Sequence, residues 1–498
     1  MICAFADLRA LALVAALAGQ ASAPPPPLPS RSEAERTVAR HLTAGRVAEA
    51  LATQEALAAR YPDDPQVLFD AARVASLAGD ARQSASFAMS ALRAGWLDDE
   101  ALASHADLAR ARAHEAWAQV TRVQREIRAE TPRVPPPTRA GSPGALVNDA
   151  RARSSLREWL ARFGGGRYRV RSEPALNLLI ASSIDTESLD RTIVMLSQLS
   201  EALTRSLFER AQDDAVLLVI APLKDADEFF KNPEHAGLYE HAPRRLVTRD
   251  TGASLRHEYT HVLHHGHMAR VGQRHPLWIQ EALATLFEHW EWGPNRELVV
   301  LPNLRSNEAY ELVRRHRAVP LAEFVTLSDS EFLAKPIDHY AQARSVLLFV
   351  AEQGRLQSFY RAVVAGFATD PTGRRALETA LDAPIGRIEA DWQAWVRARG
   401  PIDASVNTGD GVLGVSLSPL PDGVRIDEVQ EGGPAMRAGL RKGDAITQID
   451  GVDIRGVGDF LLIAAKKNPG ESLAVRFRRG GSYGTVTVRL ASSRASPP

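Results

Sequence analysis

The spacing of apolar positions divides the chain into a helical part, a mixed part and a short C-terminal part. Between residues 31 and 130, alanine-rich apolar positions recur at helical spacing, which predicts an almost wholly helical region. From about residue 165, short apolar runs alternate with helical patterns, which predicts a mixed α/β domain. Residues 304–398 again follow a helical pattern. At 498 residues the chain is long enough for about three domains.

Four short apolar runs in the mixed part are predicted to be strands of a small sheet. They are residues 168–170, 176–181, 216–220 and 246–248, with a helix predicted at 186–211. The last run directly precedes a histidine-rich helical segment and is expected to be an edge strand. The sequence thus places a sheet edge immediately before that segment.

An internal repeat marks the helical part. Gly45 and Gly79 occupy matching turns 34 residues apart, which is the period of tetratricopeptide repeats. Pro62 and Pro65 interrupt the chain where the first unit should end, and a poorer third copy is predicted at 97–125. Stacked repeats of this kind present a concave groove that binds partner segments. A plain helical cap on the neighbouring domain is the alternative.

The N-terminus has features of an export signal, predicted over residues 1–23. Arg9 precedes an apolar run that is too short to span a membrane, and small residues follow it. Asp7 and Pro24 are unfavourable in such a signal and leave its cleavage position open. Cys3, the single cysteine, would be removed with it, so neither a disulfide nor a thiolate metal site is expected. The prediction is an exported, periplasmic protein of bacterial type.

Two proline-rich segments separate the predicted domains. Residues 24–30 form a leader and residues 131–144 a linker, because proline, glycine and serine at this density disfavour a packed core. The domains are therefore placed at 31–130, 145–400 and 405–492. Lysine plus arginine and aspartate plus glutamate both total 60, so charge points to neither nucleic acid nor an anionic membrane as a partner.

The strongest chemical signal is the sequence His-Glu-Tyr-Thr-His at residues 257–261. Histidines at positions i and i+4 lie on one face of a helix, so His257 and His261 can ligate one zinc ion. Glu258 then points at the water-filled fourth position and can act as general base. Three nearby histidines are interpreted as packing or surface residues, with a proton shuttle or adventitious metal binding as the alternative. They are His264, His265 and His267.

A second helix carries the candidate third ligand. Residues 276–288 begin with proline and place Leu277, Ala284 and Phe287 on an apolar stripe. Glu281 lies on that side, where a carboxylate is costly to desolvate unless it meets a cation or a metal. An interhelical salt bridge with an arginine is the alternative. With the upstream histidines, a His-His-Glu zinc site is the favoured interpretation.

The two helices together resemble the gluzincin metallopeptidases, in particular the bacterial peptidase MA-like group. The resemblance rests on the HExxH helix followed by Trp-x-x-Glu-x-x-Ala, and it covers about residues 165–398. It implies an α+β zincin-type domain in which a small sheet packs on the active-site helix. It further implies zinc ligation by His257, His261 and Glu281, with Glu258 as base.

Two further residues are assigned roles by the same resemblance. Gluzincins often use a downstream tyrosine or histidine to hydrogen-bond the tetrahedral oxyanion, and Tyr340, near the start of an apolar helix, is the candidate. An ordinary half-buried tyrosine is the alternative. Glu288 is a candidate for orienting a ligand histidine, and a solvated helix residue is the alternative.

The C-terminal part resembles a bacterial PDZ domain over nearly all of 405–492. Its motifs are the glycine-containing opening at 411–417, Glu-Gly-Gly-Pro-Ala from residue 431 and Lys-Gly-Asp from residue 442. The resemblance implies that the opening loop binds the C-terminal carboxylate of a peptide, which adds a strand to the sheet edge, and that a helix at 457–467 forms the other wall. The implied peptide-binding residues are Val412, Leu413, Gly414, Val415 and Phe460. Core packing is the alternative for these side chains, and it leaves Ile463 undecided.

The sequence therefore predicts a multidomain protein: an all-α helical repeat, an α+β zincin-type metallopeptidase domain and a β-rich PDZ domain. The predicted function is zinc-dependent peptide-bond hydrolysis with one Zn²⁺ per chain, the PDZ domain and repeats recruiting protein substrates or partners. A catalytically inactive or structural zinc-fold scaffold is the alternative, and cleavage of another envelope amide or glycopeptide is a third. Expected partners are a peptide substrate, a C-terminal peptide ligand and a protein partner of the repeats, with neither nucleic acid nor an integral membrane segment.

Overall fold

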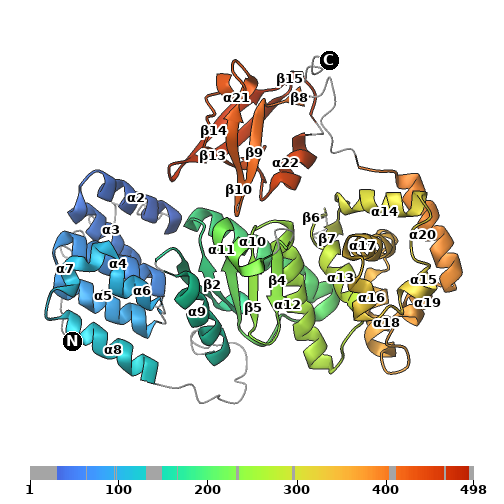
Figure 1. The fold of residues 1–498 in the computed structure, drawn as a ribbon, viewed down its shortest axis with the longest axis horizontal. Coiled ribbons are helices and arrows are strands. Elements are labelled where there is room, and N and C mark those ends of the chain that lie inside the picture. The colour runs from blue at the N-terminus through green and yellow to red at the C-terminus, as the bar shows by residue number, and fades with distance from the viewer. Residues whose placement is uncertain are drawn as a thin grey trace, which may run out of the picture.

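The computed structural model describes residues 31–129, 149–402 and 411–492, apart from residues 63, 95, 97, 165, 232–234, 294–297 and 465–466. They form a helical domain, a central domain around a five-stranded sheet, and a C-terminal β domain that sits above the central sheet (Figure 1). The predicted signal peptide, the leader and the linker at 131–144 lie outside the described residues. Among the helices of the described part, none is both long and apolar enough to cross a membrane.

The N-terminal domain is a stack of helical hairpins. Its first two hairpins are α2 (Arg31–Thr43) with α3 (Val47–Arg60), and α4 (Pro65–Ala78) with α5 (Ala81–Arg93). The second hairpin repeats the first after 34 residues, since α3 and α5 begin at residues 47 and 81 and the positive-φ glycines of the two turns, Gly45 and Gly79, have the same separation. Asp64 caps α4 by accepting two backbone N–H bonds, and Gly79 ends it with a φ of 89°. Three short elements follow, α6 (Asp99–Ser104), η1 (Ala106–Leu108) and α7 (Ala109–Arg112), and then the longer helix α8 (Trp117–Ala129). The tetratricopeptide identity of these hairpins stays a prediction.

The central sheet has the strand order β1-β2-β3-β5-β4. The strands are β1 (Arg169–Glu173), β2 (Leu178–Ser182), β3 (Val216–Ile220), β4 (Gly237–Glu240) and β5 (Arg245–Thr248). β2, β3 and β5 run parallel, and β1 and β4 are antiparallel edges. The prediction of an edge strand at 246–248 is wrong, because β4 pairs along the outer side of β5. The short sequence Gly-Leu-Tyr-Glu of β4 lacks the apolar run by which the other strands were predicted.

Helices cover both faces of this sheet. In β2, Leu178 and Ile180 join one core while Leu179 and Ala181 join the other, as the period of two along a strand requires. One face packs on α9 (Ala150–Phe163) and α11 (Leu223–Phe230), and the other on α10 (Thr186–Leu203), α12 (Ala253–Val271) and α13 (Leu277–Leu286). α10 continues into one π-helical turn, η3 (Thr204–Phe208). The hairpin β6 (Trp290–Trp292) and β7 (Leu298–Val300) leads to the C-terminal helices of this domain. These are α14 (Arg305–Arg314), α15 (Leu321–Phe324), α16 (Asp329–Leu333), α17 (Pro336–Glu352), α18 (Leu356–Gly366), α19 (Arg374–Leu381) and α20 (Ile385–Arg399).

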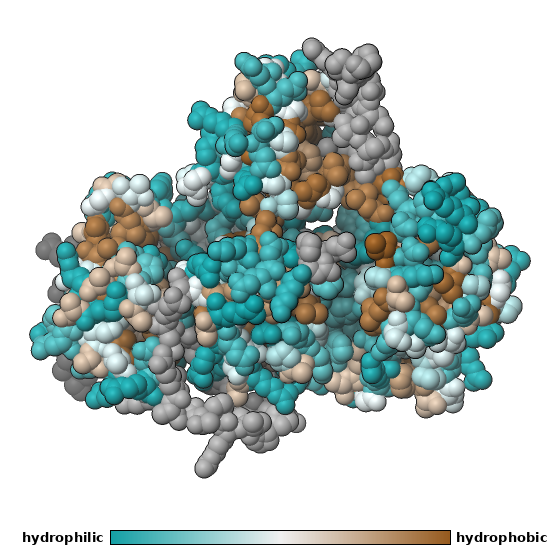
Figure 2. All heavy atoms as spheres, in the orientation of Figure 1, coloured by the Kyte–Doolittle hydropathy of each residue, from teal (hydrophilic) through white to brown (hydrophobic). Residues whose placement is uncertain are grey.

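The C-terminal domain is a twisted antiparallel sheet with two helices. Its strands are β8 (Gly411–Val412), β9 (Val415–Leu420), β10 (Gly423–Val429), β11 (Ala445–Ile449), β12 (Val452–Asp453), β13 (Ser472–Arg479), β14 (Ser482–Arg489) and β15 (Ala491–Ser492). The helices are α21 (Pro434–Arg437) and α22 (Val457–Ala464). The main sheet has the order β14-β13-β11-β10-β9, so β9 is one of its edges. Figure 2 shows a hollow between this domain and the central domain, where a cavity of about 750 Å³ lies among α22, α10 and the β6 hairpin.

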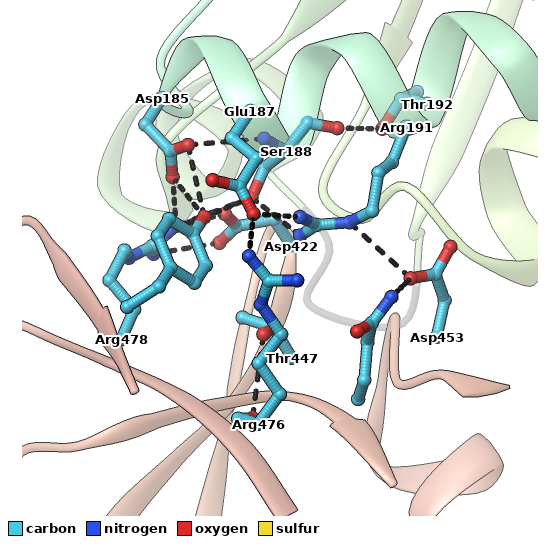
Figure 3. Close-up of polar contacts among 12 residues, drawn as sticks. Asp185, Glu187, Ser188, Arg191, Thr192, Asp422, Thr447, Asp453, Arg476 and Arg478 are labelled. Carbon is cyan, nitrogen blue, oxygen red and sulfur yellow. Dashed lines mark hydrogen bonds and ion pairs between the residues drawn. The ribbon is translucent and has the colours of Figure 1, made fainter. Parts of the chain in front are cut away.

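A polar network fastens the C-terminal domain to the start of α10 (Figure 3). Arg478 of β13 pairs with Asp185, the N-cap residue of α10, and with the buried Asp422 in the turn between β9 and β10. Tyr483 of β14 donates a hydrogen bond of 3.0 Å to Asp185. Burial alone would raise the pKa of Asp185. The charge of the Arg478 guanidinium and the hydrogen bonds that the Asp185 carboxylate accepts hold that pKa below its ordinary value. The carboxylate is therefore ionised and paired at neutral pH.

The same helix joins all three domains. Glu187 pairs with Arg476 of β13 and, at 2.5 Å, with Arg36 of α2. Arg455, which is buried, donates from its guanidinium to the hydroxyl of Thr192 at 3.3 Å. These contacts join the N-terminal helical domain and the C-terminal domain to α10 of the central domain. They therefore set the positions of the three domains relative to one another.

Candidate metal centre and peptide groove

Helices α12 and α13 place the predicted metal ligands against each other. Gly272, with a φ of 66°, ends α12 in a left-handed conformation, and Pro276 precedes the first turn of α13. The return brings Glu281 of α13 beside His257 and His261 of α12, and these three residues can offer one ligand atom each to a common ion. Helical periodicity thus sets the histidine pair, and the packing of two helices adds the carboxylate.

The spacing of the three ligand atoms fits a tetrahedral metal ion. Nε2 of His257 lies 3.2 Å from Nε2 of His261, and Oε2 of Glu281 lies 3.3 and 3.5 Å from these two nitrogens. Ligands at the usual zinc–nitrogen and zinc–oxygen distances are about 3.3 Å apart along a tetrahedron edge. Oε2 of Glu281 is also buried and accepts no hydrogen bond. A buried, unpartnered carboxylate oxygen facing two imidazole nitrogens is a suitable environment for a divalent cation.

The charges around the site lower the pKa of Glu281 and raise the pKa of His257. Burial would raise the pKa of Glu281, but the imidazoles of His261 and His257 outweigh it and keep that pKa well below the ordinary value. Burial would lower the pKa of His257, yet the adjacent carboxylates of Glu281 and Glu288 raise it to about 10. The donor set therefore attracts positive charge, supplied either by a proton or by a metal ion.

Glu288 lies directly behind the metal ligands. Its Oε1 is 3.2 Å from Nδ1 of His257, the ring nitrogen that faces away from the triad. Arg305 and Asn303 donate to the same carboxylate, Arg305 at 2.9 Å and Asn303 at 2.9 Å. Burial raises the pKa of Glu288, but the charge of Arg305 and the bond with His257 lower it to about 2. The sequence did not reveal Arg305 or Asn303, since nothing in the linear pattern ties residues after β7 to α12.

Replacing Glu288 by glutamine is expected to weaken zinc binding about 10- to 100-fold, the usual effect of losing the carboxylate behind a ligand histidine. The ring of His257 would lose its charged acceptor and its fixed orientation. Competition with a chromogenic chelator measures the dissociation constant. Glu323→Gln, an exposed carboxylate on α15, is the matched control and should leave the constant unchanged. Equal affinities for both variants would contradict the orienting role.

Glu258 is held by the edge strand of the sheet. The backbone N–H of Tyr239 in β4 donates to Oε2 of Glu258 at 2.8 Å. A Cβ at Gly237 would lie 2.7 Å from Cγ of Glu258, so only glycine permits this approach of β4 to α12. The predicted base thus lies beside the triad with one carboxylate oxygen fixed. Its position depends on a strand that the sequence analysis did not detect.

Tyr340 lines the same cavity as the triad. This cavity measures about 490 Å³ and is bounded by β4, α12, α13 and the start of α17. The ring of Tyr340 stacks on that of His257 at a centroid distance of 6.3 Å. Burial and the neighbouring carboxylates of Glu281 and Glu258 raise the pKa of Tyr340, so its phenol keeps its proton and can donate a hydrogen bond.

The remaining histidines of α12 lie outside the triad. Nε2 of His264 is 2.9 Å from Nδ1 of His275, and both rings are buried. His267 contacts the carbonyl oxygen of Phe208 at 3.2 Å. His265 stacks on His241 at 4.8 Å beside the cavity. Burial lowers the pKa of each of the three α12 histidines, so these rings are neutral packing groups at neutral pH.

The opening loop of the C-terminal domain leads into its edge strand. Gly414 has a φ of 74°, a left-handed conformation that favours glycine, and a Cβ there would also lie 3.3 Å from Cβ of Gln430. The carbonyl oxygens of Leu413 and Gly414 accept from the backbone N–H groups of Ala435 and Gln430 at 3.0 and 2.9 Å. These bonds hold the loop in place. The predicted peptide-binding residues Val412 and Val415 are half-buried, whereas Leu413 and Phe460 are buried in the domain core.

A family of known domains matches the sequence of this C-terminal domain. The sequence model of the PDZ domain family matches residues 411–490. Residues 411–490 are a PDZ domain. The prediction from the glycine-rich opening and the Lys-Gly-Asp motif is thereby confirmed.

The curated relatives that share sequence with this chain are named as periplasmic serine endoproteases. A probable periplasmic serine endoprotease DegP-like of Pseudomonas putida (strain W619) is 33% identical over 22% of this chain and 25% of its own length. The protein of the same name from Halomonas elongata is 26% identical over 18% of this chain and 24% of its own. The solved HtrA3 PDZ domain bound to a phage-derived ligand is 18% identical over 16% of this chain and 84% of its own, with a TM-score of 0.15. The chain thus spans about a quarter of the length of the two curated relatives.

The comparisons contradict the predicted activity. The curated relatives are named serine endoproteases, whereas the sequence analysis predicted a zinc metallopeptidase of the gluzincin type and zinc-dependent peptide-bond hydrolysis. That prediction is wrong and is withdrawn. The physical reason is that a ligand triad defines which ion can bind, while the reaction depends on everything else around it. The PDZ domain and the helical N-terminal part of the predicted architecture hold, and the zincin assignment of the central domain stays unsupported.

Proposed function

We propose that this chain is an exported protein that binds the C-terminal segments of peptides through its PDZ domain and holds one zinc ion in its central domain. The observation that carries the proposal is the PDZ fold itself, with a fixed glycine loop that leads into a free edge strand, β9. The periplasmic location in the names of the relatives supports export.

The peptide would bind as an added strand. An edge strand presents unpaired backbone N–H and C=O groups, which an extended peptide can pair. The backbone N–H groups of the loop at 412–415 would hold its terminal carboxylate, with half-buried Val412 and Val415 beside it. α22 forms the second wall, where Ile463 is half-buried and Phe460 supports the wall from the core. A free carboxylate and an apolar terminal side chain are the features this groove would recognise.

His257, His261 and Glu281 would hold the zinc ion, and Glu288 would orient His257. When bound, the ion supplies a Lewis acid in a cavity of about 490 Å³. Glu258, fixed by β4, can hold a proton at its free carboxylate oxygen, and Tyr340 can donate a hydrogen bond to a polar group in the cavity. The stacked hairpins of the N-terminal domain would offer a surface for a protein partner.

Blocking the C-terminal carboxylate of a peptide is expected to weaken its binding roughly 10- to 100-fold, because charge-assisted hydrogen bonds to the loop are lost. A library of free-acid peptides with apolar C-terminal residues is first screened against the whole chain, and the peptide that binds most tightly is selected. Calorimetric titration then compares this peptide with its amide.

Gly414→Ala tests the loop by itself. It should reduce affinity for the free acid, because its Cβ would lie 3.3 Å from Cβ of Gln430 and 2.9 Å from Oε1 of that residue, so the loop has to shift. Gly443→Ala carries a similar positive φ of 90° with no atom near its Cβ, and it is the matched control. Equal affinity for the acid and its amide, or absence of any binder, would contradict the proposed function.

A further inference from the structure

The peptide groove of the PDZ domain has a defined direction. β9 begins at Val415, directly after the carboxylate loop, and ends at Leu420. A peptide whose terminal carboxylate lies in the loop must therefore run antiparallel to β9, and its upstream residues leave the groove near Leu420. The first residues of α22 lie at this same end. The open end of the groove is thus formed by the end of β9 and the start of α22.

That open end faces the central domain. A cavity of about 500 Å³ is lined on one side by Pro419, Leu420 and the start of α22, and on the other by the segment that begins α12. The backbone N–H of Thr251 donates to the carbonyl oxygen of Pro421 at 2.7 Å, which ties the end of the groove to the segment just before α12. Gly252 permits the contact, since a Cβ there would lie 3.1 Å from Cβ of Arg455.

This cavity of about 500 Å³, here called the junction cavity, borders the metal-site cavity. Ala236, just before β4, and Ala253, the first residue of α12, line both of them. From Ala253 one turn of α12 leads to His257. The two cavities are therefore adjacent, and only small side chains lie between them at Ala236 and Ala253.

The orientation of the two sites is set by the polar network on α10. Arg478, Arg476 and the buried Arg455 bind α10 from three positions of the PDZ domain. Rotation of the domain would break these pairs together. The groove is thus held with its open end toward the metal site.

We propose that the PDZ groove and the metal-site cavity form one continuous binding path, in which an extended peptide held by its C-terminus places an upstream segment beside the metal triad. This inference rests on the proposed function and adds to it a fixed spacing. β9 has six residues, so about six peptide residues span it at roughly 3.3 Å each. The turn from Ala253 to His257 rises about 6 Å, which needs about two more. The segment beside the triad lies at least about eight residues from the peptide C-terminus.

Fluorescence quenching by cobalt measures this spacing. The protein is loaded with Co²⁺, a quencher of nearby dyes, and mixed with an 18-residue version of the library-selected peptide. Separate peptides carry a fluorophore about 4, 10 or 16 residues from the C-terminus. Quenching should be strongest for the label at about 10 residues, in line with the extended-chain spacing. The apo protein supplies the unquenched reference, and Glu281→Ala, incubated with the same Co²⁺, should abolish the quenching.

A bulky residue at the junction tests the path itself. Ala253 is exposed at the first position of α12, so Ala253→Trp fills the shared wall without entering the core. It should lower the quenching of the label at about 10 residues at least threefold, while a six-residue peptide binds as before. Ala390→Trp, on an exposed position of α20, is the matched control and should change neither.

The outcomes separate the two proposals. Binding of the free-acid peptide with equal quenching at all three label positions, or quenching unaffected by Ala253→Trp, overturns the continuous path alone. Failure of every free-acid peptide to bind overturns the proposed peptide binding. Failure of Co²⁺ to bind overturns the proposed metal site.

Discussion

Glu281→Ala is expected to reduce the zinc content of the purified protein from about one ion per chain to near zero. The variant removes the single anionic ligand from the triad and leaves two imidazoles whose Nε2 atoms are 3.2 Å apart. Loss of a direct ligand should exceed the 10- to 100-fold weakening that follows loss of an orienting group, so roughly a 1,000-fold or greater loss of affinity is expected. Metal analysis after dialysis against a weak chelator gives the content directly.

The matched control for this variant is His265→Ala. His265 lines the same cavity but stacks on His241 and lies outside the triad. Its removal should leave zinc content at about one per chain. Zinc retained by Glu281→Ala, or lost equally in both variants, would contradict the assignment of the ligands. A wild-type protein that takes up no zinc would contradict the metal site altogether.

Arg478→Ala is expected to release the PDZ domain from α10. The guanidinium pairs with Asp185 and with Asp422, whose side chain is only 4% exposed, so the variant leaves a buried carboxylate without its cation. Breaking a buried ion pair costs about 3–5 kcal/mol. Because the Asp185 side chain is 36% exposed and partly screened, about 2–3 kcal/mol is the better expectation here.

Hydrogen exchange of the full chain measures this release. Amides of β13 and of the first turn of α10 should exchange roughly 30- to 150-fold faster in Arg478→Ala, since each 1.4 kcal/mol is a factor of ten. Arg489→Ala removes an exposed arginine from the neighbouring strand and is the control. Unchanged exchange at both places would show that the domain is held by other contacts. That result would also remove the support this network gives to a fixed peptide path.

Elements with a strong local pattern were predictable from the sequence. The continuous apolar runs of β2 and β3 are strands, and the i, i+4 histidines and the proline-started helix after them are α12 and α13. The 34-residue period appears as two hairpins whose second helices begin at residues 47 and 81. In each case the pattern within one segment determines its local structure, because periodicity and end signals act over a few residues.

Elements that depend on distant partners were not predictable. β4 has too short an apolar pattern to be detected, and it is a strand because β5 provides the pairing groups. Arg305 meets Glu288 only after the β6–β7 hairpin has returned the chain to α12. The arginines of β13 had no visible role in the sequence, since their carboxylate partners lie about 290 residues earlier on α10.

The sequence by itself determined the chemical groups, namely a His-His-Glu set at helical spacing and a glycine loop before a PDZ edge strand. These are local properties, because side-chain identity and backbone preference are written in neighbouring residues. Only the tertiary structure decided that Glu288, Arg305 and β4 surround the metal ligands, and that the PDZ groove opens toward them. Those arrangements arise from packing and ion pairs between segments far apart in the chain, and no local pattern encodes their geometry.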